Sequence, residues 1–248
     1  DKDGEALERA KTKLEGKAKS LTLLQVDFRE LDTVLQKLNL VGQVDSILMD
    51  IGISSDQLDY SKRGFSFQRD EPLLMTMKDK VSKSTLTAHE IVNKWDEENI
   101  TAVISGYGEE RYAKRIARRI VEERSKKSIE STKELAEIIV KSYPAKDRHK
   151  KIHPATKTFQ ALRITVNDEL EALKEGIKKG VANLRQSGRM GIISFHSLED
   201  RIVKRSFRDY ATQGLAKLIT KKPITATETE VSANPRSRSA KLRVIEKI

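Results

Sequence analysis

The chain has 248 residues, with 48 lysines and arginines against 37 aspartates and glutamates, a formal net charge of +11 and a pI near 9.6. It has no cysteine, which excludes disulfides, zinc–thiolate sites and cysteine nucleophiles. We predict no metal site, because metal-ligand spacing is absent from the four histidines, His89, His149, His153 and His196.

The excess of positive charge favours a polyanionic partner, with nucleic acid ahead of a membrane surface. A soluble basic protein without such a partner is the alternative. No apolar run approaches the ~20 residues that cross a membrane, and the opening Asp-Lys-Asp has no signal-peptide pattern. We therefore expect no membrane association and a cytoplasmic location, with an organelle matrix as the alternative.

The first part of the chain alternates between helix and strand patterns. Short apolar runs over residues 21–26 and 44–50 predict two strands. Helical spacing is found in two sets of apolar residues, Ala6, Leu7, Ala10 and Leu14, and then Leu31, Leu35 and Leu38. This rhythm is typical of a parallel sheet with crossover helices.

Residues from about 67 to 144 have no strand pattern and predict a helical block. One helix is expected around Ile91–Trp95, a second over 109–124, and a third after the capping-box pattern Ser131-Thr-Lys-Glu134. The second helix has one apolar face and one basic face, the latter formed by Arg111, Lys114, Arg115, Arg118 and Arg119.

Helix and strand alternate again after this block. Apolar residues at spacings of three or four over 170–184 predict a long helix. A buried strand over 190–195, a helix over 198–207 and a final strand over 240–248 follow, with an irregular segment over 211–240. The overall pattern predicts an α/β protein with an inserted helical block.

Polar residues follow three predicted strand ends, at Asp27-Phe28, at Asp50 to Gln57 and at Ser194 to Ser197. Ligands bind beyond the carboxyl ends of strands in open α/β sheets. The Asp50 carboxylate can accept hydrogen bonds from an amine or a hydroxyl, although an aspartate that merely caps the next turn is the alternative.

Residues near the start of the chain and at the first predicted strand end suit an adenosine-type ligand. The acidic residues before the first helix, Asp1 and Asp3, could bind ribose hydroxyls, and Phe28 could stack on adenine. No glycine-rich loop precedes them in the sequence.

Six segments carry distinctive motifs along the whole chain: Leu48–Leu58, Arg63–Phe67, Tyr107–Arg111, His153–Ile164, Ile193–Lys204 and Asn234–Ser239. Together they resemble the bacterial ribosomal RNA small subunit methyltransferase H family, also called MraW. The resemblance implies a Rossmann-like class I S-adenosylmethionine-dependent methyltransferase core with an inserted helical domain. It also implies that the family's first strand and most of its second, with a glycine-rich cofactor loop, are absent from this sequence.

The same resemblance implies a division of the chain into three parts. Residues 1–66 and 150–248 would form the methyltransferase core, and 67–149 an inserted domain for RNA recognition. The reaction would transfer a methyl group from S-adenosylmethionine to the exocyclic N4 of a cytidine in 16S ribosomal RNA. Small-subunit ribosomal RNA or the 30S subunit would be the partner, and a homodimer is left open.

Matching motifs place four residues on the family's cofactor-binding positions, namely Asp1, Phe28, Asp50 and Gln57. In our hypothesis Asp50 contacts the cofactor or the target amine, while Ser54 and Ser55 orient the base. His196 is a second candidate proton acceptor. The alternative for His196 is a strand-end histidine that is bonded to backbone.

RNA contacts are predicted at two kinds of residue. Arg63 and Phe65 could clamp or stack a splayed nucleotide, unless the phenylalanine belongs to the core. Phosphate contacts are predicted for basic residues, unless they form ordinary solvated faces: Arg115, Arg118, Lys157, Arg163, Arg236 and Arg238.

Three residues depart from the family's pattern, which usually reads Pro-Leu-Asp-Met-Arg-Met-Asp over 72–78. Leu74, Thr76 and Lys78 stand in place of two acids and an arginine. A catalytically silent RNA-binding fragment of the same fold is the alternative function. A nicotinamide-dependent enzyme is disfavoured because no GxGxxG motif occurs.

Overall fold

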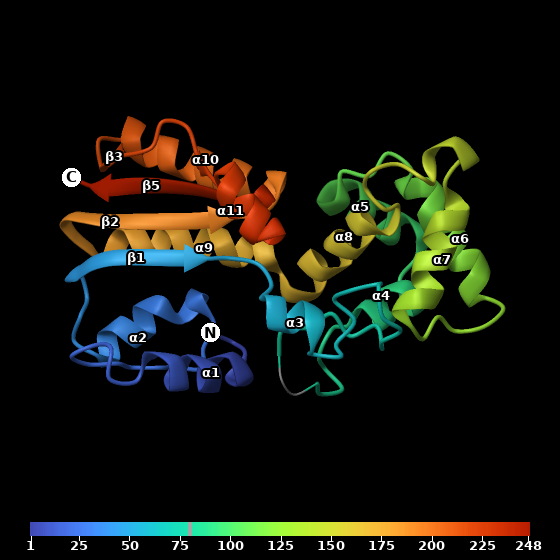
Figure 1. Ribbon diagram of the computed structural model, residues 1–248, viewed down its shortest axis with the longest axis horizontal. Coiled ribbons are helices and arrows are strands. Elements are labelled where there is room, and N and C mark those ends of the chain that lie inside the picture. The colour runs from blue at the N-terminus through green and yellow to red at the C-terminus, as the bar shows by residue number, and fades with distance from the viewer. Residues whose placement is uncertain (79–80) are drawn as a thin grey trace. The chain divides into compact units, whose positions relative to one another are not determined.

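The computed structural model describes residues 1–78 and 81–248, which form two compact units (Figure 1). The sheet unit comprises Asp1, Ala6–Gly52 and Glu169–Ile248. The helical unit comprises Lys2–Glu5 and Ile53–Asp168. Each unit has its own cluster of buried hydrophobic side chains.

The sheet unit is built on five strands: β1 (Val44–Asp50), β2 (Leu184–Ser194), β3 (Ala216–Leu218), β4 (Ile224–Thr225) and β5 (Lys241–Lys247). Their order is β1-β2-β5-β3, and β4 pairs with β5. β1 and β2 are parallel, with Asp50 opposite Ile193, whereas β5 runs antiparallel to β2 and β3. The predicted α/β class is confirmed.

Helices accompany this sheet: α1 (Gly4–Leu14), which begins in the helical unit, α2 (Leu31–Lys37), α9 (Glu169–Asn183), α10 (Ser197–Thr212) and α11 (Glu228–Ala233). Two short 3₁₀ helices, η1 (Phe28–Glu30) and η3 (Pro235–Ser239), complete the unit. Helix α9 packs so closely on the strands that a Cβ at Gly180 would lie only 2.9 Å from Met190 Cε. Leu173, Ile177 and Val181 of α9 belong to the buried cluster of this unit.

The helical unit contains α3 (Ser55–Asp59), α4 (Ala88–Lys94), α5 (Glu97–Gly108), α6 (Ala113–Arg124), α7 (Thr132–Ser142), η2 (Ala145–Asp147) and α8 (Ala155–Asn167). Its core includes five fully buried side chains, namely Ile91, Ile104, Ile116, Leu135 and Leu162. The predicted capping box at Ser131 is confirmed: its side chain accepts a hydrogen bond from Glu134 N–H.

The strand predicted over residues 21–26 is wrong, because these residues form no strand. Leu21 and Leu24 stay 43% and 38% exposed. β1 lies at the edge of the sheet and pairs with β2, not with this segment. An apolar run becomes a strand only when a neighbouring strand satisfies its backbone groups.

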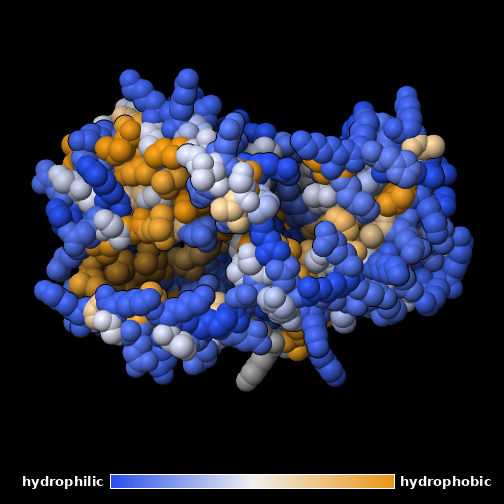
Figure 2. Space-filling view, in the orientation of Figure 1, coloured by the Kyte–Doolittle hydropathy of each residue, from blue (hydrophilic) through white to orange (hydrophobic). Residues whose placement is uncertain are grey.

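Hydrophobic side chains therefore reach the surface of the sheet unit, and Figure 2 shows them gathered beside the labelled strands β1 and β2 of Figure 1. Leu48 on β1 is 68% exposed. Across the described ranges 1–78 and 81–248, none of the helices is long and apolar enough to span a lipid bilayer.

The helix predicted over 109–124 begins later than expected, at Ala113. Glu109 has a φ of 47°, a left-handed conformation that ends α5. Tyr112 stands at the N-cap of α6. The apolar spacing of 112, 116 and 120 was therefore a sound sign of the buried face, but it did not mark the start of the helix.

Candidate active site

Asp50 is the last residue of β1 and stands where the predicted ligand site begins. Its side chain reaches solvent, yet the protein atoms packed around the carboxyl raise the pKa of Asp50 above its usual value of 3.8. Ile51 N–H still bonds to the carbonyl of Ile193 on β2 at 3.2 Å. Gly52 then turns the chain with a φ of 100°, which glycine adopts without strain.

Phe28 is also part of the sheet unit, at the start of η1. Asp27 caps this turn, since its carboxylate accepts a hydrogen bond from Arg29 N–H at 2.9 Å. The half-buried Phe28 ring packs against the sheet-unit core. A Cβ at Gly176 would lie 2.7 Å from Phe28 Cδ2, so the glycine is required for the ring to lie there.

Asp1, the other predicted cofactor residue in this unit, is exposed. Its backbone nitrogen lies 3.2 Å from Leu24 O.

Ser54 and Gln57 cap helix α3 in the helical unit. Ser54 Oγ accepts from Gln57 N–H at 3.1 Å, and Gln57 Oε1 accepts from Ser54 N–H at 3.0 Å. The Gln57 amide also donates to Asp3 Oδ2 at 2.8 Å, and Gln57 is only 7% exposed. Its side chain is therefore committed to holding the loop, while Ser55 is exposed.

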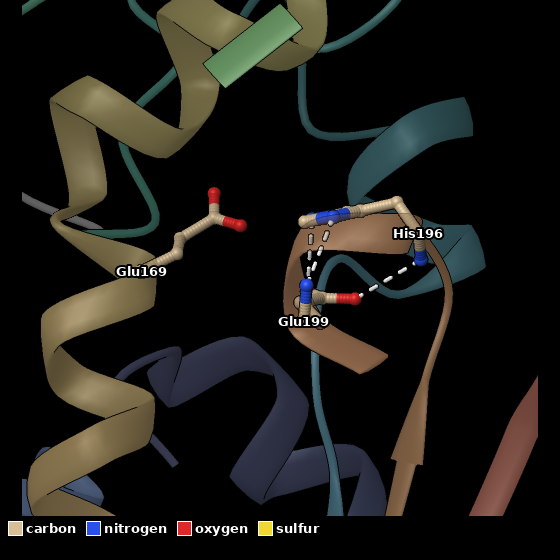
Figure 3. Close-up of side chains that lie close together, drawn as sticks. All are labelled: Glu169, His196 and Glu199. Carbon is tan, nitrogen blue, oxygen red and sulfur yellow. Dashed lines mark hydrogen bonds and ion pairs between the residues drawn. The ribbon is translucent and has the colours of Figure 1, made fainter. Parts of the chain in front are cut away.

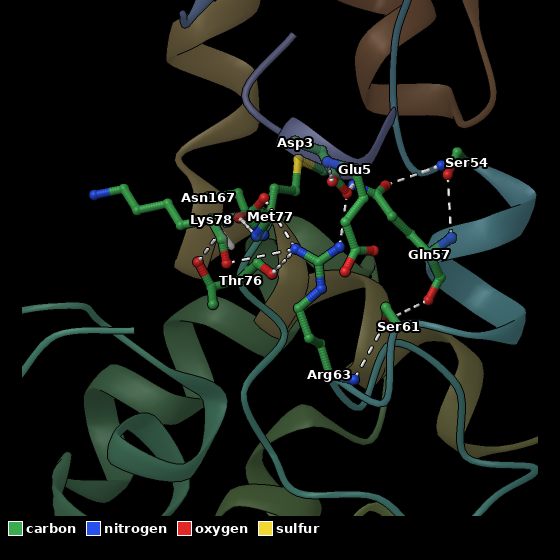
Figure 4. Close-up of polar contacts among 10 residues, drawn as sticks. All are labelled: Asp3, Glu5, Ser54, Gln57, Ser61, Arg63, Thr76, Met77, Lys78 and Asn167. Atoms are coloured by element: carbon green, nitrogen blue, oxygen red, sulfur yellow. Dashed lines mark hydrogen bonds and ion pairs between the residues drawn. The ribbon is translucent and has the colours of Figure 1, made fainter. Parts of the chain in front are cut away.

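Arg63 lies at the centre of a buried network in the helical unit (Figure 4). Its guanidinium binds Asp3 Oδ2 at 2.7 Å and donates to the carbonyl of Met77 at 3.0 Å. It also reaches the carbonyls of Thr76 and Lys78 at 3.4 Å each. The side chain of Asp3 is 1% exposed, so Arg63 balances a sealed negative charge.

This network engages the Arg63 guanidinium, which the sequence suggested as an RNA clamp. The guanidinium is hydrogen-bonded to protein carbonyls and to Asp3. Phe65 is a core residue that is 7% exposed. Neither is presented to a nucleotide in this conformation. Sequence motifs revealed that Arg63 was special, but they gave no sign of its partner because Asp3 lies far away in the chain.

The divergent segment over 72–78 contributes backbone atoms to the same network. The carbonyls of Thr76, Met77 and Lys78 face Arg63, and Met77 N–H donates to Asn167 Oδ1 at 2.8 Å. Substitution of side chains at 74, 76 and 78 leaves these carbonyls in place. The departure from the family pattern is therefore compatible with an intact network.

His196 is the N-cap residue of α10 in the sheet unit, and Glu199 lies three residues further along the chain (Figure 3). Its Nδ1 accepts from Glu199 N–H at 3.4 Å, and Glu199 Oε2 accepts from Phe195 N–H at 2.8 Å. A neutral histidine that accepts at Nδ1 carries its proton on Nε2. In this arrangement His196 has no free lone pair with which to accept a proton from a substrate.

The basic residues predicted to contact RNA differ in how strongly other side chains engage them. On α6, Arg115 and Arg118 are exposed, and Arg118 pairs with Glu122 at 2.9 Å. Lys157 on α8 donates to the carbonyl of Glu109 at 2.8 Å, and Arg163 is half-buried. In the sheet unit, two exposed arginines lie within η3, namely Arg236 and Arg238.

Comparison with known proteins identifies the class of this molecule. A model of the MraW methylase family matches residues 1–248. The chain is 50% identical over 244 residues to "Ribosomal RNA small subunit methyltransferase H" of Sulfurihydrogenibium sp. (strain YO3AOP1), covering 98% of this chain and 82% of the relative. It is 48% identical to the protein of the same name from Persephonella marina, covering all of this chain and 83% of the relative.

The α/β sheet, the strand-end carboxylate and these matches define an enzyme of the class I methyltransferase type. The chain belongs to the MraW methylase family, and the resemblance found in the sequence is thus confirmed.

Proposed function

We propose that this enzyme transfers a methyl group from S-adenosylmethionine to small-subunit ribosomal RNA, at the exocyclic N4 of a cytidine. The names of the relatives support the RNA substrate. The observation that carries the chemistry is Asp50, an accessible carboxylate of raised pKa at the end of a parallel strand.

The residues in the sheet unit suit an adenosyl cofactor. Phe28 offers an aromatic ring held in place against Gly176, and Asp50 offers an acceptor for hydroxyl or amino groups. Asp1 is a further exposed acid at the start of this unit. S-adenosylmethionine would supply an electrophilic methyl group on its sulfonium sulfur. Gln57 has its amide occupied, so we propose that it acts by fixing the loop.

The amine of cytosine is a weak nucleophile, because its lone pair is delocalised into the ring. We propose that Asp50 accepts hydrogen bonds from this amine and takes up the proton that is lost on methylation. Since the pKa of Asp50 is raised, its carboxylate is a better proton acceptor than an ordinary aspartate. Ser54 and Ser55 lie a few residues further along the chain and would orient the base.

The backbone of the RNA would be bound by exposed and half-buried basic side chains. Arg115 and Arg118 of α6, with Lys157 and Arg163 of α8, are the proposed contacts in the helical unit. Arg236 and Arg238 are the proposed contacts in the sheet unit. Such contacts confer affinity that falls with salt concentration.

The test is the rate of methyl transfer to small ribosomal subunits with Asp50→Asn. We expect a loss of about 10²–10⁴-fold in kcat, the range of general base contributions. Asp45→Asn is the matched control, because Asp45 is an exposed acid on the same strand. Equal rates for both variants would contradict the role of Asp50, and a wild-type protein that binds RNA without methylating it would favour a silent RNA-binding protein.

A further inference from the structure

Three side chains of metal-binding type meet in the sheet unit (Figure 3). Glu169 is the first residue of α9, His196 caps α10, and Glu199 lies in the first turn of α10. One ligand atom from each side chain lies within 4.8 Å of the other two. The carboxylate of Glu169 points toward the imidazole ring of His196.

Two of the three side chains are largely buried. The side chain of Glu199 is 2% exposed and that of His196 is 11% exposed. Nε2 of His196 is buried and makes no hydrogen bond, although Glu199 Oε1 lies 3.2 Å away. A buried nitrogen without a hydrogen bond is costly, and two neighbouring carboxylates repel each other. A bound cation would relieve both.

The next residue, Asp200, shows how this unit balances an acid with its own side chains. Its carboxylate is bound by Arg243 at 2.7 Å and approached by Lys241 at 3.5 Å. Glu199, the residue before it, has its Oε1 3.2 Å from Nε2 of His196.

We propose that Glu169, His196 and Glu199 bind one divalent cation of the first transition row, of the Zn²⁺ or Mn²⁺ type. Imidazole together with two carboxylates suits these ions, at ligand distances of about 2.0–2.2 Å. The three ligand atoms, which lie within 4.8 Å of one another, must draw together around the ion. Three protein ligands leave room for water.

Binding of the ion requires the lone pair of Nε2, so the proton must move to Nδ1 of His196. The contact from Glu199 N–H to Nδ1, at 3.4 Å, is longer than a typical hydrogen bond and is readily given up. The ring changes tautomer and its total number of protons stays the same. This change gives the proposal a spectroscopic signature that a merely structural cap lacks.

Spacing rules missed this site because its ligands come from two helices. Glu169 follows the left-handed residue Asp168 at the start of α9, far from His196 in the sequence. Only the His-x-x-Glu spacing of the α10 cap is local, and that pattern alone is a capping box.

The test is calorimetric titration of the metal-free protein with ZnCl₂ and separately with MnCl₂. We expect saturable binding of one ion per chain, weakened about tenfold or more in Glu169→Gln. The cap of α10 is formed by His196 and Glu199 without Glu169, so this variant should fold. Glu171→Gln, which removes an exposed acid on the same helix, is the control and should bind like the wild type.

Nitrogen NMR of His196 provides the second readout. The Nε2–H tautomer is expected without metal and the Nδ1–H tautomer with it. Binding that is unchanged in Glu169→Gln, an unchanged tautomer, or no saturable binding of either ion would overturn the proposal. The experiment uses no RNA and no methyl donor, so its outcome is separate from that of the proposed methylation.

Discussion

Replacement of Arg63 with alanine distinguishes a structural role for this residue from a role in RNA binding. The substitution removes the guanidinium that pairs with Asp3, whose side chain is 1% exposed and whose Oδ2 lies 2.7 Å from it. Removing one partner of a buried ion pair costs about 3–5 kcal/mol. Since a whole domain is stable by only about 5–15 kcal/mol, Arg63→Ala should visibly destabilise the helical unit.

The assay is urea unfolding followed by the fluorescence of Trp95. The sequence has a single tryptophan, and Trp95 packs against the core of the helical unit, so its signal reports on that unit. Arg69→Ala is the control: Arg69 is exposed in the same loop, and we expect a change within about 0.5 kcal/mol.

A double-mutant cycle with Asp3→Asn should give a coupling free energy of roughly 0.5–3 kcal/mol, because the two side chains are in contact. Unfolding of Arg63→Ala at the same urea concentration as the wild type, together with a loss of affinity for RNA, would contradict this structural role. That result would mean that the guanidinium serves the nucleotide and not Asp3.

Three further substitutions test other parts of the account. Arg115→Glu should weaken RNA binding and reduce the salt dependence of binding by about one unit of slope. Hydrogen bonding from Lys150 lowers the pKa of Asp147 from 3.8 to about 2. The stability that the ionised Asp147 carboxylate confers is therefore present above pH 4 and is lost as the pH falls toward 2. Asp147→Asn should flatten that decline, as measured by urea unfolding. Gly176→Ala should displace Phe28, because the new Cβ would lie 2.7 Å from its ring, and should weaken S-adenosylmethionine binding in calorimetry by about tenfold.

Each of these has its own control and contrary result. Lys141→Glu reverses an exposed charge on α7, and an equal effect on RNA binding would mean that the position of Arg115 does not matter. If Asp147→Asn and the wild type lost stability equally steeply as the pH falls, the Asp147 carboxylate would not be the cause of that decline. Gly106→Ala adds a Cβ with no atom within 4 Å, so a matching loss of cofactor affinity there would indicate a general effect.

Local patterns in the sequence predicted much of the sheet unit. The strand ending at Asp50, the strand before His196 and the final strand all have apolar runs long enough to be recognised, and the structure contains β1, β2 and β5 there. The run over 21–26 failed because strand formation depends on a partner that composition does not reveal.

The buried polar contacts of both units could not be predicted in this way. The capping box of Ser54 and Gln57 is a local pattern, but the bond from Gln57 to Asp3 joins segments distant in the chain. Arg63 and Phe65 have the residue types of an RNA contact, and only their burial reveals another role. Identical side chains serve either purpose, and tertiary structure decides which.

The identity of the methylated nucleoside tests the central claim most directly. Small ribosomal subunits that lack the modification would be incubated with the protein and labelled S-adenosylmethionine, and the RNA would then be digested to nucleosides for mass spectrometry. We predict that the label appears in N4-methylcytidine and is lost with Asp50→Asn. Label in another nucleoside, or in protein, or undiminished labelling by the Asp50 variant, would contradict the account.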